Sequence, residues 1–287
     1  MDHSVAHKEQ YPFADLSLAR RLERAEAGAN IDFVQGRAKA FPERGATWCE
    51  IAGTYAMFDG RTSPITQTFA LGMFQPLIER ELHSIEKFFL DRHAPVCHEM
   101  CPLADASVLP LLNERGYQPI EFTSVLYRPI QAQSGLSIST NNNIVVRLSE
   151  PNEREAWAET AFRGWSDFGE LADFLLELGK VNARRENALC FVAELNGQSI
   201  GTGLMSIVDG VALLAGASTI PEARKRGAQL ALLESRLRYA ADHGCDIAMM
   251  GALPGSASQR NAERHHFRIA YTRVKWQLMN TSLASFS

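Results

Sequence analysis

The stretch Thr219-Ile-Pro-Glu-Ala-Arg-Lys-Arg-Gly-Ala-Gln229 decides the fold that we predict for this chain. It joins an apolar run at residues 211–218 to an amphipathic segment at residues 224–242, which predicts a turn from a strand into a helix. The turn carries three consecutive cations and then a glycine: Arg224, Lys225, Arg226 and Gly227. The first N–H groups of a helix lack partners and lie at the positive end of its dipole, where extra cations are unfavourable. We therefore predict that this turn cradles an anion, most simply a phosphate group, which the glycine lets approach closely.

Other interpretations of this turn have to be weighed against a phosphate cradle. A Walker loop would end in Gly-Lys-Ser/Thr, and a dinucleotide-binding loop needs three spaced glycines, so both are excluded by the residues present. Two alternatives remain on the residues alone. The turn could be the solvated basic end of a helix, or it could bind some other phosphorylated metabolite.

The pattern from residue 144 onward predicts a mixed α/β order. Short apolar runs predict strands, and apolar side chains at helical spacing from 150 to 187 predict a pair of helices. Asn196-Gly197 lies between two apolar runs and is a strong hairpin signal. Ser256 and Gln259 have the spacing of a capping box and open a short helix to His266. The predicted order is strand, two helices, three strands, helix, strand, helix, strand.

The first 130 residues repeat the later part of that order. We expect, in sequence, a helix at 16–27, strands at 47–58 and 65–74 on either side of Asp59-Gly60, a helix at 78–89, a strand at 95–100, a helix at 104–115 and a strand at 119–128. At the ends of the two halves, Glu114-Arg115 and Phe122-Thr123 align at one constant offset with Glu263-Arg264 and Tyr271-Thr272. We interpret this match as an internal duplication, with chance resemblance of strand-rich segments as the alternative.

A polar, low-charge stretch at residues 131–143 separates the two halves and is typical of a linker. We therefore predict two domains, a degenerate one at 1–130 and a ligand-binding one at 144–287. The fold class is α/β, mixed α+β, with a mixed, mostly antiparallel sheet flanked by helices in each domain.

Composition and charge exclude several classes of function. The chain is 46% hydrophobic and 22% charged, with a formal net charge of −4, which is typical of a soluble globular protein. It has no basic surplus for following a nucleic-acid backbone and no apolar run near the roughly 20 residues that span a bilayer. We expect neither nucleic acid nor membrane as a partner. The polar N-terminus has no signal-peptide core, which favours a cytoplasmic location.

The five cysteines are odd in number and scattered, so we interpret them as reduced thiols. One cluster has the short spacing of metal ligands: His93, Cys97, His98 and Cys101. A closed zinc site needs four well-placed ligands, whereas these residues straddle a helix end and a strand. We expect no metal.

The turn and the element order after residue 144 together resemble the GCN5-related N-acetyltransferase (GNAT) family, over about 140 residues. Pro221-Glu-Ala-Arg-Lys-Arg-Gly-Ala-Gln229 is similar to the family signature Arg/Gln-x-x-Gly-x-Gly/Ala. Arg224 and Gly227 match the signature, and Gln229 departs from it. The resemblance implies an acetyltransferase that uses acetyl-CoA as co-substrate and binds its pyrophosphate at this turn.

By the same resemblance, the residues that contact CoA come from three segments of the second half. They are Ser218, Thr219 and Ile220 on the strand, Arg224, Lys225, Arg226, Gly227, Ala228 and Gln229 on the turn, and Ser256, Ser258 and Asn261 on the later helix. That helix departs from the family at two places. His266 replaces a usual glycine, and Ala262 stands where the family often has a tyrosine, so the usual general acid is missing from its place.

Transfer of an acyl group to an amine needs a neutral nucleophile, a polarised thioester carbonyl and a proton for the departing thiolate. Backbone N–H groups near Thr219 are candidates for polarising the carbonyl. Tyr271 is the best-placed hydroxyl for the proton, and Ser258 is the second catalytic candidate. The candidate bases are Glu194, Asp209, His265 and His266, each of which also fits a solvated surface side chain.

Trp165 and Phe168 lie between the two predicted helices that form the wall of the acceptor pocket in this family, although aromatic residues at such spacing also fit a core. The function favoured is transfer of an acetyl or other acyl group from CoA to a small-molecule or peptide amine, by direct attack in a ternary complex. The alternative is a non-catalytic acyl-CoA-binding or regulatory protein. A homodimer is left open.

Overall fold

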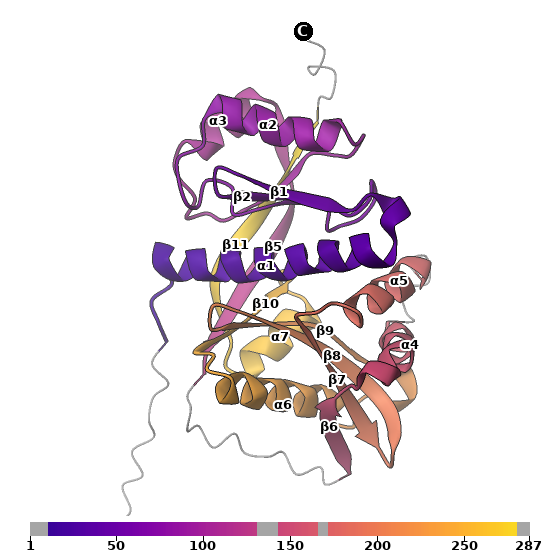
Figure 1. Cartoon of the computed structure of the whole chain (residues 1–287). Helices are drawn as coiled ribbons and strands as arrows, with labels where there is room; N and C mark the ends of the chain where they lie inside the picture. The colour runs from indigo at the N-terminus through magenta and orange to yellow at the C-terminus, as the bar shows by residue number, and fades with distance from the viewer. Residues whose placement is uncertain (1–10, 131–142, 166–171, 280–287) are drawn as a thin grey trace, which may run out of the picture.

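The computed structural model describes residues 11–130, 143–165 and 172–279 (Figure 1). The first half contains α1 (Leu16–Ala40), η1 (Pro42–Arg44), β1 (Thr47–Ile51), β2 (Thr54–Phe58), β3 (Gln67–Phe69), α2 (Glu79–Leu90), β4 (Cys97–Met100), α3 (Val108–Glu114) and β5 (Tyr117–Pro129). The second half contains β6 (Ile144–Leu148), η2 (Pro151–Glu153), α4 (Arg154–Gly164), α5 (Ala172–Asn182), β7 (Ala188–Leu195), β8 (Gln198–Val208), β9 (Val211–Thr219), η4 (Pro221–Ala223), α6 (Ala228–Asp242), β10 (Ile247–Ala252), α7 (Ala257–Arg264) and β11 (Arg268–Leu278). Over these ranges, no helix has the length and apolar character that a membrane span requires.

All strands join one 11-stranded sheet in the order β1-β2-β3-β4-β11-β5-β10-β9-β8-β7-β6. The prediction of two separate sheets is therefore wrong. β11 inserts between β4 and β5, and β5 in turn pairs with β10, so each half donates its last strand to the other. Apolar periodicity could not show this exchange, because it tells which face of a strand is buried and leaves open which strand pairs with it.

Helices cover the two faces of the sheet unequally. α1 lies across the middle of the molecule, over strands of both halves (Figure 1). Leu18 and Leu22 of α1 pack in one core with Val125, Met249 and Tyr271, from β5, β10 and β11. The opposite face is covered by α2 and α3 in the first half and by α6 and α7 in the second (Figure 1). A single helix therefore ties the two halves together on one side.

Most predicted elements are confirmed. In the first half the predicted strand at 65–74 is shorter, at Gln67–Phe69, and two larger differences follow. The predicted helix at 16–27 continues to Ala40. A Cβ on Gly28 would lie 3.3 Å from Val208 Cγ2, and a Cβ on Gly36 would lie 3.0 Å from Arg185 Cγ. These glycines let α1 pack closely on the second half, whereas in the sequence they look like the end of a helix.

The second difference is the hairpin. β1 and β2 form one within the predicted strand at 47–58, with Ala52 and Gly53 at positive φ in its turn. Asp59-Gly60 instead opens a loop that leads to β3. The predicted linker at 131–143 lies outside the described residues except for Asn143, and so does Phe168.

Candidate functional site

A wedge opens in the sheet between β9 and β10. These parallel strands pair only from Ile247 with Val211 to Met249 with Leu213. Beyond that point β10 stays beside β5 up to Ala252, while β9 stays beside β8 up to Thr219. We call the gap between residues 214–219 and 250–252 the wedge. On the side of the wedge, the backbone N–H and C=O groups of β9 and β10 have no strand to pair with.

A bulge in β9 sets the direction of these backbone groups. The register of β8 with β9 shifts between Thr202 and Leu204, and Gly216 at the shift has a left-handed φ of 56°. After the bulge, Ile220 donates its N–H to the carbonyl of Ile200 at 3.0 Å. Successive residues in a strand point their backbone groups to opposite sides, so the N–H of Thr219 faces the wedge.

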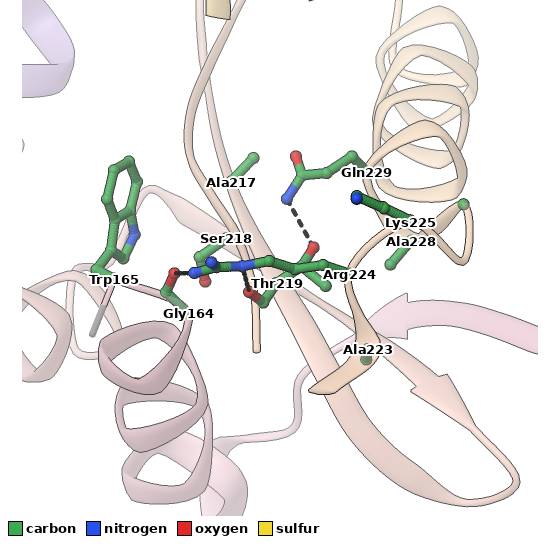
Figure 2. Close-up of a pocket in the computed structure, with 11 residues that line it drawn as sticks. Gly164, Trp165, Ala217, Ser218, Thr219, Ala223, Arg224, Lys225, Ala228 and Gln229 are labelled. Atoms are coloured by element: carbon green, nitrogen blue, oxygen red, sulfur yellow. Dashed lines mark hydrogen bonds between the residues drawn. The ribbon is translucent and has the colours of Figure 1, made fainter. Parts of the chain in front are cut away.

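The first of two hollows lies where β9 runs into the turn and has a volume of about 430 Å³ (Figure 2). Arg224 crosses its floor, with Nε 3.5 Å from the carbonyl oxygen of Thr219 and Nη2 3.3 Å from that of Gly164. Gln229 Nε2 donates to Thr219 Oγ1 at 2.8 Å. A Cβ on Gly164 would lie 3.0 Å from the N atom of Thr219, so the end of α4 has to be glycine to approach β9 this closely.

The helix that follows the turn begins later than predicted. α6 starts at Ala228, after a short 3-10 turn at 221–223, so the three cations precede the helix instead of forming its first turn. Gly227 is the N-cap, at a φ of 92°, and no side chain caps the helix. The first turn contains no acidic residue. The free N–H groups of this helix end are thus left for a ligand.

The second hollow adjoins the first and has a volume of about 420 Å³. Trp165, Ala217 and Gln229 line both. Its wall includes Arg236 of α6, which is 3% exposed and hydrogen-bonds the carbonyl oxygens of Leu204 and Ala215 at 3.1 and 3.2 Å. Burial lowers the pKa of Arg236 to about 10. The residues lining the two hollows include three cations and no carboxylate, which suits an anionic ligand.

The structure brings most of the predicted CoA contacts together. Lining the first hollow are Ser218, Thr219, Arg224, Lys225, Gly227, Ala228 and Gln229, with Trp165 from the predicted acceptor wall. Ser258 and Asn261 line the second hollow. Three predicted contacts line neither: Ile220, Arg226 and Ser256. Ile220 is buried with its N–H already used, and Ser256 Oγ caps α7 by accepting the N–H of Gln259 at 3.2 Å.

Tyr271 lies on the α1 face and lines neither hollow. It is 6% exposed, and its hydroxyl donates to Glu23 Oε1 at 2.8 Å. Burial raises its pKa well above the usual value, with the Glu23 carboxylate adding to the shift. Arg273 also donates to Glu23 Oε1, at 3.0 Å, and to Glu26 Oε2 at 2.8 Å. Tyr271 thus belongs to a buried polar network that joins α1 to β11.

The candidate bases stand apart from the hollows. Glu194 accepts a hydrogen bond from Arg147 at 2.6 Å, and Asp209 lies in a turn at positive φ. Burial lowers the pKa of His265. His266 has a φ of 63° at the end of α7, where a glycine would meet less strain. None of the four lines either hollow.

The histidine and cysteines whose spacing resembles that of metal ligands have other partners or lie in the core. His98 is fully buried between Thr68 Oγ1 at 2.8 Å and the Tyr117 hydroxyl at 3.0 Å, and burial lowers its pKa to about 3. Cys97 and Cys101 are buried free thiols. Within residues 11–130, 143–165 and 172–279, no three histidine, cysteine or acidic side chains are grouped so as to hold a metal ion.

Sequence reasoning missed one residue of the site, Arg236, which lines the second hollow. Arg236 lies among Leu232, Leu233 and Leu237 on the buried face of α6. A cation on the apolar stripe of a predicted helix was the signal that could have found it.

Comparisons with known proteins agree with this geometry. Residues 146–267 match the model of the acetyltransferase (GNAT) family. This half of the chain is a GNAT-family domain. A search of the curated proteins gave no match.

Solved GNAT structures share the fold well beyond that domain. A GCN5-related N-acetyltransferase from Kribbella flavida is 15% identical with a TM-score of 0.60, covering 91% of this chain and 98% of that one. A tandem GNAT protein from the clavulanic acid biosynthesis pathway is 10% identical with a TM-score of 0.56, covering 79% of each chain. A GCN5-related N-acetyltransferase from Sphaerobacter thermophilus is 18% identical with a TM-score of 0.52, covering 78% of this chain and 76% of that one. At these identities the likeness concerns the fold alone.

Proposed function

We propose that the protein is an acetyl-CoA-dependent N-acyltransferase, in which the second half binds the acyl-CoA and transfers its acyl group to an amine. The observation that carries this proposal is the wedge beside β9, which leads to an uncapped helix end at Gly227 with a rim of cations. Such an end binds a diphosphate through its N–H groups and its dipole. The GNAT match of this half supports the same reading.

Each part of acyl-CoA has a matching part of the site. The pyrophosphate would take the N–H groups of Ala228 and Gln229, with Arg224 and Lys225 at the rim. The pantetheine arm would lie along β9 in the wedge, where it can use strand-like backbone hydrogen bonds. We place the thioester carbonyl at the N–H of Thr219, which would stabilise the oxyanion of the tetrahedral intermediate.

The reaction is a direct attack in a ternary complex. An amine that has lost its proton attacks the thioester carbon, the C–N bond forms, and the C–S bond breaks with its electron pair on sulfur. Two hydroxyls are proposed to protonate that thiolate: Ser258, which lines the second hollow, and Tyr271, which lies on the α1 face in the buried network. Trp165 would border the acceptor, with Phe168 the second proposed contact.

The first half is proposed to have lost CoA binding. The helix α2 begins with Glu79 and Glu81 in its first turn, and Glu81 Oε2 accepts the N–H of Ile78 at 3.2 Å. A carboxylate at this end occupies a free N–H group and repels a pyrophosphate. We therefore keep the division into a degenerate domain at 1–130, a linker at 131–143 and an acyl-CoA domain at 144–287.

A second candidate function is a non-catalytic acyl-CoA-binding or regulatory protein. It is favoured by Ala262, which is 1% exposed and stands where the family often has a tyrosine. CoA release on a panel of primary amines separates the two candidates. Turnover of acetyl-CoA with any amine supports the enzyme, and binding without turnover supports the regulatory protein.

Calorimetry with CoA and acetyl-CoA tests the binding site. We expect one CoA per chain, and Gly227→Glu should abolish binding because it places bulk and negative charge in the cradle. Gly227→Asn is the matched control, since it also adds a side chain at positive φ but carries no charge, and asparagine tolerates this backbone better than most residues. Two sites per chain, or unchanged affinity in Gly227→Glu, would contradict the proposal.

A further inference from the structure

One carboxylate of α1, a helix of the first half, lies beside the β10 edge of the wedge. Gly251 of β10 lines the second hollow. A Cβ on Gly251 would point to the α1 face, 3.5 Å from Thr123 Cγ2 and 4.0 Å from Glu26 Oε1. Because Gly251 has no Cβ, no side chain of this residue fills the space between its backbone and that oxygen.

Glu26 is held in a fixed position with one oxygen in use. Arg273, which is 1% exposed, donates from Nη2 to Glu26 Oε2 at 2.8 Å. The same guanidinium donates from Nε to Glu23 Oε1, which also accepts the Tyr271 hydroxyl. The side chain of Glu26 is 17% exposed. Its Oε1 is the atom that lies toward Gly251.

This network gathers three carboxyl groups around one guanidinium. Arg273 lies within 4.0 Å of three carboxylates, those of Glu23, Glu26 and Glu99. Glu23 Oε2 and Glu99 Oε2 are buried and find no hydrogen-bond partner among the described residues. Burial raises the pKa of Glu99 to about 7, against the opposing effect of Arg273. Burial also raises the pKa of Glu23, so Glu23 and Glu99 hold protons more readily than usual, and Glu26 is the carboxylate of this cluster that lies beside Gly251.

The charge that lines the hollows differs from the charge beside Gly251. Arg224, Lys225 and Arg236 line the two hollows, whereas the carboxylate of Glu26 lies on the α1 face of Gly251. An anionic acyl donor in the hollows and a cationic amine beside Gly251 would each meet opposite charge.

We infer that Glu26 of α1 binds the acceptor ammonium at the β10 edge of the wedge and takes its proton, so that the first half completes the active site of the second. The inference rests on the proposed function. Glu26 accepts one proton from the ammonium, and the neutral amine attacks the thioester carbon. The second amine proton passes to the leaving thiolate, which gives CoA and the amide. Glu26 then returns its proton to solvent.

The test uses two CoA thioethers of equal length, so that no natural acceptor is needed. S-(4-aminobutyl)-CoA carries an ammonium group where S-pentyl-CoA carries a methyl group. Calorimetry on the full chain should show the amino compound binding about tenfold or more tightly, because its cation reaches Glu26. In Glu26→Gln this preference should fall to within about twofold, while affinity for CoA itself stays unchanged.

Matched variants distinguish the effect of the Glu26 charge from an effect on folding. The amide of Glu26→Gln can still accept the hydrogen bond from Arg273, so the network keeps its shape. Glu50→Gln is the control, since it removes an exposed carboxylate on β1. Gly251→Val is the second variant, because it blocks the path to Glu26 with contacts no closer at Cβ than 3.5 Å. It should also remove the preference, measured as the ratio of the affinities of this variant for the two thioethers.

The outcomes are distinguishable. If the parent protein binds CoA but does not prefer the amino compound, or if Glu26→Gln keeps the preference, the assignment of Glu26 is wrong and the proposed function stands. If neither thioether nor CoA binds, the proposed function itself fails. Loss of the preference in Glu26→Gln and Gly251→Val but not in Glu50→Gln supports the inference.

Discussion

At the scale of single residues, the two hydroxyls proposed to protonate the thiolate lie in different surroundings. Ser258 is exposed and lines the second hollow, whereas Tyr271 is buried and hydrogen-bonded to Glu23. Both were candidates for protonating the thiolate. If Tyr271 fills this role, Tyr271→Phe should lower kcat by about 10²–10⁴-fold with CoA affinity nearly unchanged, because the ring still packs. Steady-state kinetics and CoA titration of both variants measure this.

Ser258→Ala is the matched comparison for Tyr271→Phe. It removes a hydroxyl from an exposed position on α7 and leaves the buried network intact. A kcat within about threefold of the parent in Tyr271→Phe, together with a large loss in Ser258→Ala, assigns the proton to Ser258. Joint loss of stability and CoA binding in Tyr271→Phe would show that Tyr271 only supports the fold.

Residue types in the sequence predicted the cationic turn at Gly227 but not the position of Glu26 beside Gly251. Arg224 and Gly227 lie in one short turn, so binding of an anion there could be predicted from their spacing in the sequence. Glu26 and Gly251 are far apart in the chain and meet only because β10 and α1 pack together. No local pattern contains that information. The side chain of Gln229 also could not be placed from the sequence, and it turns into the first hollow.

At the scale of elements, the bulged strand β9 and the helix α6 act as one unit. Arg236 of α6 reaches through the core to the carbonyls of Leu204 and Ala215, which pair directly beside the bulge. This contact holds the two strands at the point where β9 turns its backbone groups to the wedge. A buried guanidinium without a hydrogen-bonded carboxylate is costly, so we expect its retention to serve the wedge more than stability.

Replacing Arg236 tests this link between helix and strand. Arg236→Met keeps an apolar helix face and should leave the melting temperature within a few degrees, since a buried charge is removed along with its hydrogen bonds. CoA affinity should fall about tenfold or more because the bulge loses its anchor. Arg238→Met, at an exposed position of the same helix, is the control. Lost stability with unchanged CoA affinity would contradict the link.

Secondary structure was predicted correctly where the residues of a turn specify its backbone conformation. Asn196 and Gly197 have left-handed φ values of 53° and 76°, as a two-residue hairpin requires, and the strands on either side follow from that turn. The start of α6 was misplaced because Arg224 and Lys225 favour a helix locally, while the backbone of Lys225 has a φ of 62° that breaks it. Tertiary packing on β9 overrides local preference there.

At the scale of the whole molecule, the two halves depend on each other through buried ion pairs. Arg273 of β11 needs Glu23 and Glu26 of α1, and Arg185 pairs with Asp32 of α1 at 2.7 Å. A half on its own leaves these arginines buried without partners or forces them into solvent, at a cost of about 3–5 kcal/mol for each broken pair. It would also uncover the core that α1 shields.

Splitting the chain within residues 131–142 tests this dependence. We expect the piece 143–287 alone to aggregate and to bind no CoA, because its α1 face is uncovered and β10 and β11 lose β5 between them. Co-expression with 1–142 should give a one-to-one complex that binds CoA. Size-exclusion chromatography and calorimetry measure both. A soluble, CoA-binding 143–287 piece would contradict the expectation.

The position of β11 also determines when the protein can fold during synthesis. A ribosome releases β4 and β5 long before residues 268–278 leave its exit tunnel, and until then the slot between those two strands is empty. During synthesis the first half therefore exposes the unpaired edges of β4 and β5, which are sites for incorrect strand pairing. A premature stop that removed only β11 would take out the centre of the sheet instead of its border, and neither half could close.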